Sequence, residues 1–384
     1  MTKISAVISE YNPFHNGHAY NLELAKKQGD LLAVIQSGNF TQRGEIALQD
    51  KYVRAIHAIK GGADIVVELP TVYATSNAEI FALGGIKIFS LLNASTLCFG
   101  AENDNPQDFI KTAKATLKET SSFKKQLKTN LKLGYKFAKA KYLALCSQEN
   151  VNGELLEKPN NILALEYTKA LLKTKKDFSI YPIKRIGANF NDASFLGEFS
   201  SASGIRHALA LGKDVKCAVP SYSYLDLPTL PPNLDREIIY SVKTKSAKEL
   251  KNLPDVSEGL ENRILHCAKN CYSFESLVQN LLTKRYTQTR LQRILISSLL
   301  NIDKKLINIA KKTTPYVKVL AIKKDKLSML GTLSKTCTLI TKKSDIQKLN
   351  KNQKLLLEKD ILSCEIYSLA TQKEINPFNM QIVE

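Results

Sequence analysis

The strongest constraint on the fold lies at the start of the chain. A short apolar run, residues 4–8, is followed at once by EYNPFHNGH, residues 10–18. Pro13 restricts the residue before it to extended geometry, so a helix cannot begin earlier. The pattern predicts a strand, a tight loop and a helix whose free N–H groups form a phosphate site. His15 and His18 then lie on one face of the first turn, and the glycine between them lets the backbone approach a ligand closely.

In the rest of the first hundred residues, short apolar runs typical of strands alternate with the apolar spacing typical of helices. We expect strands over residues 3–9, 31–36, 64–69 and 96–100, and helices over residues 17–27, 48–60 and 77–92. This order predicts an α/β fold with a Rossmann-like, doubly wound parallel sheet. Ligands of such sheets bind at the carboxyl ends of the strands. The polar features that fall at these ends are His15, His18, the 37–45 loop, Glu68 and Gly100.

The next segment is an insertion followed by a return to the sheet. Residues 106–148 are lysine-rich and predicted to be helical, with a break at Gly134. Pro159-Asn160-Asn161 is expected to open a helix over residues 162–173, because an Asn before an apolar-periodic run is an N-cap signal. Residues 179–184 then read as a fifth strand of the same sheet.

A serine-rich segment carries the second chemical motif. Ser200-Ser201-Ala202-Ser203-Gly204-Ile205-Arg206 runs into a further predicted helix. Hydroxyls and backbone amides at a helix start, with an arginine one turn later, suit a triphosphate. Plain N-capping would also explain the serines. Their pairing with the histidine motif on one predicted sheet favours the phosphate interpretation.

Positive charge is unevenly distributed along the chain. The formal net charge is +19. Residues 1–100 contain 8 Lys or Arg and 8 Asp or Glu, so the whole excess of 19 lies in residues 101–384. A neutral N-terminal region joined to basic regions indicates that the later regions contact a polyanion. The alternative is a lysine-rich surface without such a partner, because Lys far outnumbers Arg.

Cysteine usage and hydropathy set the expected compartment. The 7 cysteines are odd in number, and no signal peptide precedes residue 4, so we expect reduced thiols in the cytoplasm. The first apolar run is too short to span a membrane, and no membrane contact is expected. His266-Cys267 and Cys271 lack a second ligand pair at zinc spacing, so no metal site is expected. No protein partner is inferred.

The carboxyl-terminal part reads as helical and basic. Ser273 is expected to cap a helix to about residue 282. The candidate RNA-binding residues that follow are Lys284, Arg285, Tyr286, Arg290 and Arg293. The last three share a face if the segment is helical, and cations beside an aromatic ring suit RNA. The alternative is intramolecular pairing, for example with Glu258 and Glu261. Residues 316–322 and 336–341 are predicted strands of a small terminal α/β module.

Taken together, HxGH early and SSxSxIR late resemble the nucleotidyltransferase superfamily. Longer strings resemble the bacterial tRNA(Met) cytidine acetate ligase family over roughly residues 3–322. These strings are EYNPFHNGH, SGNFTQRGE, FGAE, PNNILALEY, KRIGANFND, SSASGIR, SEGLENRI and KRYTQTRLQRIL. One departure is Gly204, where a larger residue is expected; Arg206 keeps its place.

The resemblance implies a ligase that uses ATP and free acetate. Acetate would attack the α-phosphate of ATP, giving acetyl-adenylate and pyrophosphate. The N4 amine of the wobble cytidine of elongator tRNA(Met) would then take the acetyl group, giving N4-acetylcytidine and AMP. Mg²⁺ is expected only as the companion of ATP, since no carboxylate cage is visible. The expected division is a catalytic domain over residues 1–212, a helical tRNA-binding region over 213–312 and the terminal module over 313–384.

The resemblance also implies which residues act. His15, His18 and Arg206 are the expected catalytic residues. The expected ATP-binding residues are Val7, Ile8, Ser9, Glu10, Tyr11, Asn12, Pro13, Phe14, His15, Asn16, Gly17, His18, Ala19, Tyr20, Gly100, Asn161, Arg185, Ile186, Ser200 and Ser203. Asn160 is the less favoured of the adjacent pair, and the sequence leaves open which of the two contacts ATP. The acetate-binding residues and the oligomeric state are not identified.

Two other functions compete with this interpretation. The first is a nucleotidyltransferase that builds a small nucleotide cofactor, which would leave the large basic region without a use. The second is a non-catalytic RNA-binding protein, which would need neither His15 nor His18.

Overall fold

One mixed sheet organises the chain. The computed structural model describes residues 2–174, 176–186 and 197–384. Within them the sheet has 8 strands in the order β5-β4-β1-β2-β3-β6-β7, and β8 also pairs with β6. The strands are β1 (Ile4–Ser9), β2 (Leu31–Ser37), β3 (Ile65–Leu69), β4 (Thr96–Ala101), β5 (Ser179–Lys184), β6 (Val317–Lys323), β7 (Leu339–Ile340) and β8 (Gln381–Val383).

The first five strands form the predicted doubly wound core. Neighbouring strands among them are all parallel, with Val7 of β1 opposite Val34 of β2 and Cys98 of β4. These strands are continuous apolar runs because helices cover both of their faces. The predicted α/β class and the fifth strand are confirmed.

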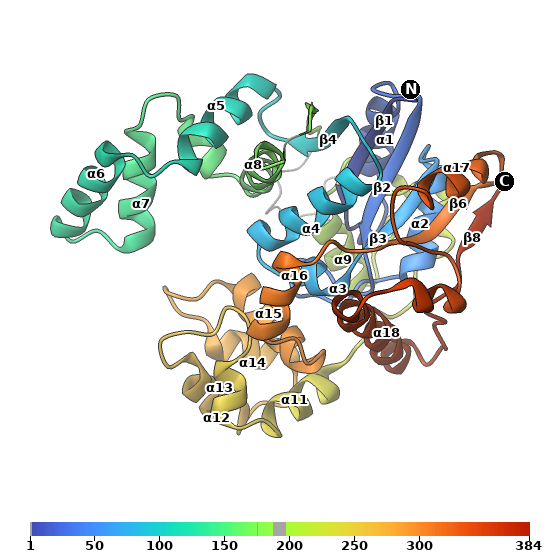
Figure 1. Cartoon of the computed structure of the whole chain (residues 1–384). Helices are drawn as coiled ribbons and strands as arrows, with labels where there is room; N and C mark the ends of the chain where they lie inside the picture. The colour runs from blue at the N-terminus through green and yellow to red at the C-terminus, as the bar shows by residue number, and fades with distance from the viewer. Residues whose placement is uncertain (1, 175, 187–196) are drawn as a thin grey trace.

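Two sets of helices cover the two faces of the sheet (Figure 1), and alternate strand residues pack against them. On one face, α1 (Asn16–Lys26) and α2 (Lys51–Lys60) bury side chains such as Leu22 against Val34. On the other, α3 (Thr71–Ala74), α4 (Ala78–Leu91) and α8 (Pro159–Leu172) pack against residues such as Ile35. The carboxyl ends of β1 and β4 therefore open at one edge, where the predicted motifs lie.

The lysine-rich insertion is a helical arm. It consists of α5 (Pro106–Leu117), α6 (Ser121–Lys132) and α7 (Phe137–Cys146), and α6 and α7 lie far from the sheet in Figure 1. Gly134 has a positive φ of 83° between α6 and α7, so the predicted break is confirmed. A short 3-10 helix, Gly153–Leu156, leads back to α8.

A helical region follows the fifth strand. Its helices are α9 (Ala202–Ala210), α10 (Ser221–Tyr224), α11 (Asp235–Lys243), α12 (Ala247–Lys251), α13 (Leu260–Ala268), α14 (Phe274–Leu281), α15 (Gln288–Leu299) and α16 (Lys304–Lys312). The predicted cap is confirmed, since Ser273 Oγ accepts a hydrogen bond from Ser276 N at 3.2 Å. Within the described residues, no helix is both long and apolar enough to cross a membrane.

The terminal segment returns to the sheet. The two expected strands are present as β6 and β7, but β6 pairs antiparallel with β3, so they extend the main sheet instead of forming their own. The helices here are α17 (Ser328–Leu333) and α18 (Lys351–Thr371), and α18 packs on α3. The sequence carries no signal for this long-range pairing. The proposed domain boundaries stay a prediction.

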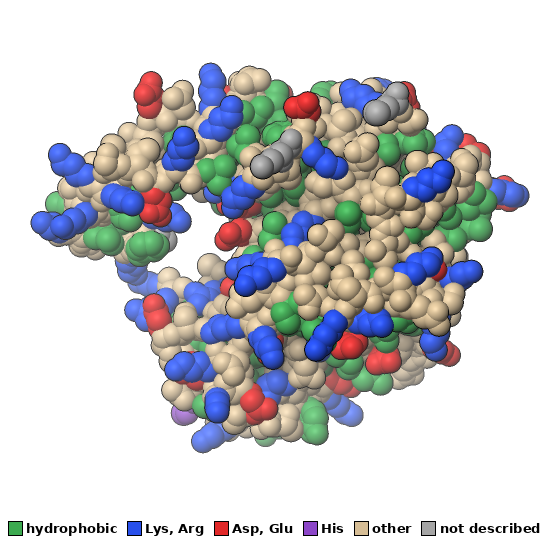
Figure 2. Space-filling view, in the orientation of Figure 1, with side chains coloured by type: hydrophobic (Ala, Val, Ile, Leu, Met, Phe, Trp, Pro, Cys, Tyr) green, Lys and Arg blue, Asp and Glu red, His purple; other side chains and the backbone are tan. Residues whose placement is uncertain are grey.

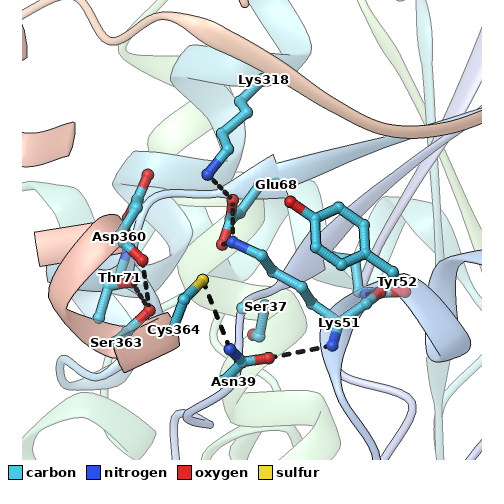
Figure 3. Close-up of polar contacts among 12 residues, drawn as sticks. Ser37, Asn39, Lys51, Tyr52, Glu68, Thr71, Lys318, Asp360, Ser363 and Cys364 are labelled. Carbon is cyan, nitrogen blue, oxygen red and sulfur yellow. Dashed lines mark hydrogen bonds and ion pairs between the residues drawn. The ribbon is translucent and has the colours of Figure 1, made fainter. Parts of the chain in front are cut away.

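A buried charged cluster joins the terminal segment to β3 (Figure 3). Glu68 forms ion pairs with Lys51 Nζ at 2.8 Å and with Lys318 Nζ at 2.9 Å, and all three side chains are at most 2% exposed. Asp360 of α18 accepts a hydrogen bond from Thr71 N at 2.7 Å and another from the Tyr316 hydroxyl. Burial and the nearby Glu68 raise the pKa of Asp360.

Candidate active site

A cavity lies at the carboxyl ends of β1, β4 and β5. It is bordered by the first turn of α1, the 37–45 loop, α8 and the start of α9. The two sequence motifs, nearly two hundred residues apart, therefore meet in one place, as predicted.

His15 and His18 lie stacked in this cavity. Their ring centroids are 3.6 Å apart with an interplanar angle of 26°, and His15 is only 6% exposed. His15 N donates to His18 Nδ1 at 3.3 Å, which fixes the second ring at the helix start. His15 Nδ1 is buried and has no hydrogen-bond partner among the described residues. The pair therefore holds hydrogen-bonding capacity that the described protein groups leave unused.

Both imidazoles are held neutral. Burial, reinforced by the nearby charges of Arg185 and Arg206, lowers the pKa of His15 to about 3. Burial, His15 and Arg185 lower the pKa of His18 well below its usual range. Neutral imidazoles in a partly desolvated site are hydrogen-bond donors, and an anionic ligand would offset the repulsion from the arginines.

Gly17 lies tightly against the ring of His15. A Cβ on this residue would lie 3.0 Å from His15 Cε1 and 3.1 Å from His15 Nδ1. The absence of a side chain at this position therefore leaves room for the His15 ring. The Asn16 side chain turns elsewhere and donates to the carbonyls of Glu198 at 3.1 Å and Cys217 at 2.8 Å.

The serine motif opens α9 against the cavity. Ser201 is the N-cap, and its Oγ accepts from Gly204 N at 3.0 Å, so the helix continues through the unexpected glycine. Arg206 donates to Asn12 O at 2.7 Å and pairs with Glu45 at 2.6 Å. Capping and cavity lining thus occur together, because Ser200, Ser201 and Ser203 all border the cavity.

The 37–45 loop lies at the cavity, as expected, and contributes side chains that were not named individually among the candidate site residues. Gln42, Arg43 and Glu45 line the cavity opposite α1. Gln42 N donates to Glu10 Oε1 at 2.5 Å, and burial raises the pKa of Glu10. The string SGNFTQRGE at a strand end was the available signal for this loop. An apolar wall was missed as well; it consists of Phe81, Phe99, Leu163, Ala164 and Tyr167.

The Arg54 side chain holds the start of the 37–45 loop against the end of β1. Its side chain is fully buried and donates to the carbonyls of Glu10 at 2.5 Å, Ser37 at 3.2 Å and Gln49 at 2.9 Å, and also to that of Gly38. One guanidinium therefore ties the ends of β1 and β2 together. The sequence gives no sign of this role, since Arg54 lies in an ordinary amphipathic helix.

Asn160 and Asn161 have different positions. Asn160 lines the cavity. Asn161 is 1% exposed, and its Oδ1 accepts from Glu102 N at 2.9 Å and Asn103 N at 3.2 Å. The expected N-cap role is wrong, because α8 begins at Pro159 with Lys158 as its N-cap, and the ring of a proline is favoured in a first turn.

The remaining ATP-site predictions divide into two groups. Those that line the cavity are Val7, Ile8, Ser9, Glu10, Tyr11, Asn12, His15, Gly17, His18, Tyr20, Gly100, Arg185, Ile186, Ser200 and Ser203. Those that do not line it are Pro13, Phe14, Asn16, Ala19 and Asn161. Phe14 is fully buried and packs its ring against Tyr11 with centroids 5.0 Å apart. Residues 187–192, the end of the string KRIGANFND, lie outside the described residues.

The predicted RNA-binding residues are arranged differently from the expectation. Tyr286 precedes α15 and is only 6% exposed, so it shares no helix face with the arginines and its ring is not open to a base. Arg290 lies 5.1 Å from its ring centroid and donates to Asp255 O, and Arg293 pairs with Asp255 at 3.4 Å. Arg285 pairs with Glu258 at 2.9 Å, which is the intramolecular alternative. Lys284 is exposed.

The chain is similar in sequence to a known family over nearly its whole length. The family model of the HIGH nucleotidyl transferases matches residues 2–381. The tRNA(Met) cytidine acetate ligase of Thermoanaerobacter sp. (strain X514) is 38% identical over 96% of this chain and 95% of its own length. The ligase of the same name from Clostridium botulinum (strain Okra / Type B1) is 36% identical over 95% and 94%.

Two solved structures share the architecture. Apo TmcAL of Thermotoga maritima superposes with a TM-score of 0.91 and 28% identity, covering 99% of both chains. The same protein bound with alpha-thio ATP gives a TM-score of 0.89 and 27% identity, covering 99% of this chain and 100% of that one. The sheet, the paired histidines and the family match define this chain as a HIGH nucleotidyl transferase. Within that class, it belongs to the tRNA(Met) cytidine acetate ligase family.

Proposed function

We propose that this chain is a cytoplasmic ligase that acetylates N4 of the wobble cytidine of elongator tRNA(Met), using ATP and acetate. Support comes from the name of its relatives and from the alpha-thio ATP bound by the TmcAL neighbour. The observation that carries the proposal is the convergence of two neutral histidines and two arginines, Arg185 and Arg206, on one cavity.

The first step is adenylation. A carboxylate oxygen of acetate attacks the α-phosphorus of ATP, and the bond to the bridging oxygen breaks, so pyrophosphate leaves with the electron pair. Negative charge builds on the α-phosphate oxygens, where His15 and His18 donate hydrogen bonds. Arg185 and Arg206 offset the charge of the departing pyrophosphate. The protein thereby supplies positioning and charge stabilisation, the main needs of phosphoryl chemistry.

The second step is acyl transfer. The cytidine N4 amine attacks the acetyl carbonyl carbon, the bond to the AMP oxygen breaks, and the amine loses one proton. The AMP phosphate is a good leaving group, and the same histidines can hold its oxygens through both steps.

The apolar wall of the cavity suits the nucleoside. Phe99 and Tyr167 have ring centroids 6.2 Å apart on this wall. An adenine ring placed there would leave the phosphates between α1 and α9. Among the described residues, no group of three or more His, Cys, Asp or Glu could hold a metal ion, and Mg²⁺ would enter as the companion of ATP.

The test is ATP–pyrophosphate exchange with and without acetate, in the absence of tRNA. Exchange that requires acetate is the expected result and establishes an acyl-adenylate ligase. The unmodified tRNA(Met) transcript should then accept labelled acetyl groups at one cytidine. Exchange without acetate, or an adenylyl group transferred to a small mononucleotide, would favour the cofactor-building function instead.

A further inference from the structure

The turn between α6 and α7 exposes a group of large apolar side chains. Leu133 is 69% exposed, Tyr135 is 45% exposed and Phe137 is 62% exposed, and Leu131 beside them is 42% exposed. Single exposed apolar residues are ordinary, but four within seven residues at the end of a projecting arm form a patch. We call residues 131–137 the arm tip.

Behind the arm tip, α6 and α7 pack against each other through buried residues. Phe123, Asn130 and Ala140 are buried between α6 and α7, and Asn130 Nδ2 donates to Ala140 O at 3.1 Å. Gly134, with its positive φ, closes the turn. The inward faces of both helices are thus filled by other residues, and the arm leaves a large part of each arm-tip side chain uncovered.

Charge around the arm tip has a single sign. Residues 121–146 contain no Asp or Glu, and their lysines are all exposed: Lys124, Lys125, Lys128, Lys132, Lys136, Lys139 and Lys141. Figure 2 shows basic side chains over the arm, with hydrophobic and a few acidic ones among them, beside a hollow that separates the arm from the helical region. The cationic surface fits a polyanion, and the two aromatic rings fit unstacked bases.

The arm is also attached to the active site at both of its ends. It begins just after β4, whose Gly100 lines the cavity, and it leads into α8, whose Asn160 lines the cavity. The base of the arm therefore adjoins the cavity, while the arm tip projects away from it.

We propose that the arm tip binds single-stranded nucleotides of the tRNA substrate, with bases on Tyr135 and Phe137 and phosphates on the surrounding lysines. The inference rests on the proposed function and names the surface that recognises its RNA. It replaces Tyr286, whose ring is buried, as the aromatic part of the RNA site.

The test measures affinity for an unmodified elongator tRNA(Met) transcript by fluorescence anisotropy. Tyr135→Ala and Phe137→Ala should each weaken binding about tenfold, with an unchanged slope of log affinity against log salt. Phe137→Tyr should keep the affinity, whereas Phe137→Leu, which is apolar but lacks a ring, should lose most of it. A Lys132→Gln, Lys136→Gln, Lys139→Gln triple variant should reduce the salt slope by about 0.7 for each phosphate that the protein no longer neutralises.

The control is Tyr272→Ala, since Tyr272 is 80% exposed with Lys243 above its ring but lies outside the arm. Equal losses of affinity in Tyr272→Ala and Phe137→Ala, or none in either, would overturn the proposal. So would retained affinity in Phe137→Leu together with concentration-dependent dimers or binding to anionic vesicles, which would assign the patch to a protein or a membrane. Acetate-dependent ATP–pyrophosphate exchange without RNA should equal wild type in every variant. If the wild type shows no acetate-dependent ATP–pyrophosphate exchange, the proposed ligase activity is refuted. The RNA-binding measurements can still be interpreted on their own.

Discussion

Asn161 and Glu102 exchange hydrogen bonds in both directions. Asn161 Oδ1 accepts from Glu102 N at 2.9 Å, and Glu102 Oε2 accepts from Asn161 N at 3.1 Å. The same carboxylate accepts from Asn160 Nδ2 at 2.7 Å through its other oxygen. The end of β4 is thereby fixed to the first turn of α8, and Asn160 is held at the cavity.

This relationship predicts different defects for the two asparagines. Asn161→Ala removes the acceptor of two backbone N–H groups in a buried position, so the thermal midpoint should fall by several degrees. Asn160→Ala should leave the midpoint within about a degree and raise the KM for ATP in pyrophosphate exchange. A raised KM for ATP in Asn161→Ala without any loss of stability would show that Asn161, not Asn160, contacts ATP.

Loss of His18 should slow the proposed adenylation step without weakening RNA binding. His18→Ala removes a preorganised donor from the α-phosphate, and such donors contribute about a hundredfold to a thousandfold in rate. Acetate-dependent exchange should fall by that factor while tRNA affinity stays within about twofold. His207→Ala is the matched control, because His207 is exposed on α9. Wild-type turnover in His18→Ala would remove this residue from the mechanism.

The neutral histidines also make stability depend on pH. The pKa of His15 is about 3 in the folded chain, against an ordinary value near 6.5 in an unfolded one. Between these values the unfolded state binds more protons, so the free energy of unfolding falls as pH falls below about 6.5, by about 1.4 kcal/mol per pH unit. The thermal midpoint of wild type should therefore drop more between pH 7 and pH 5 than that of His15→Asn. Identical drops in the two proteins would contradict a neutral, buried His15.

The cluster in Figure 3 predicts an asymmetry between its acid and its bases. Glu68→Gln leaves Lys51 and Lys318 buried with one fewer anion, which should cost about 3–5 kcal/mol. Lys318→Met keeps the Lys51–Glu68 pair and should cost clearly less. Thermal unfolding of both variants measures the difference, and Lys335→Met, at an exposed lysine, is the control. Equal losses of stability would mean that β6 docks through packing, not through this cluster.

The local features were predictable because their causes are local. The apolar runs of β1 to β5 and the cap at Ser273 each depend on a segment of about ten residues or fewer. Their boundaries were predicted to within a few residues. The HxGH and SSxSxIR strings were placed correctly at one edge, since the carboxyl ends of parallel strands must meet there.

Other features depend on segments that are distant in the sequence. Tyr286 is buried within the large apolar cluster, and Arg293 pairs with Asp255 from the loop before α13, so both arrangements depend on tertiary packing. The carbonyls that surround Arg54 come from three separate segments, so its helix looked like any solvated amphipathic helix.

The sequence alone determined the class of sheet and the edge at which the HxGH and SSxSxIR motifs meet, because strand periodicity and motif spacing act over short distances. Only the tertiary structure decided that β6 closes the edge of β3, that Asn160 and not Asn161 faces the cavity, and that the arm exposes its aromatic tip. Long-range strand pairing and side-chain burial depend on contacts between distant segments. Such contacts do not produce a periodic pattern in the sequence of the residues that make them.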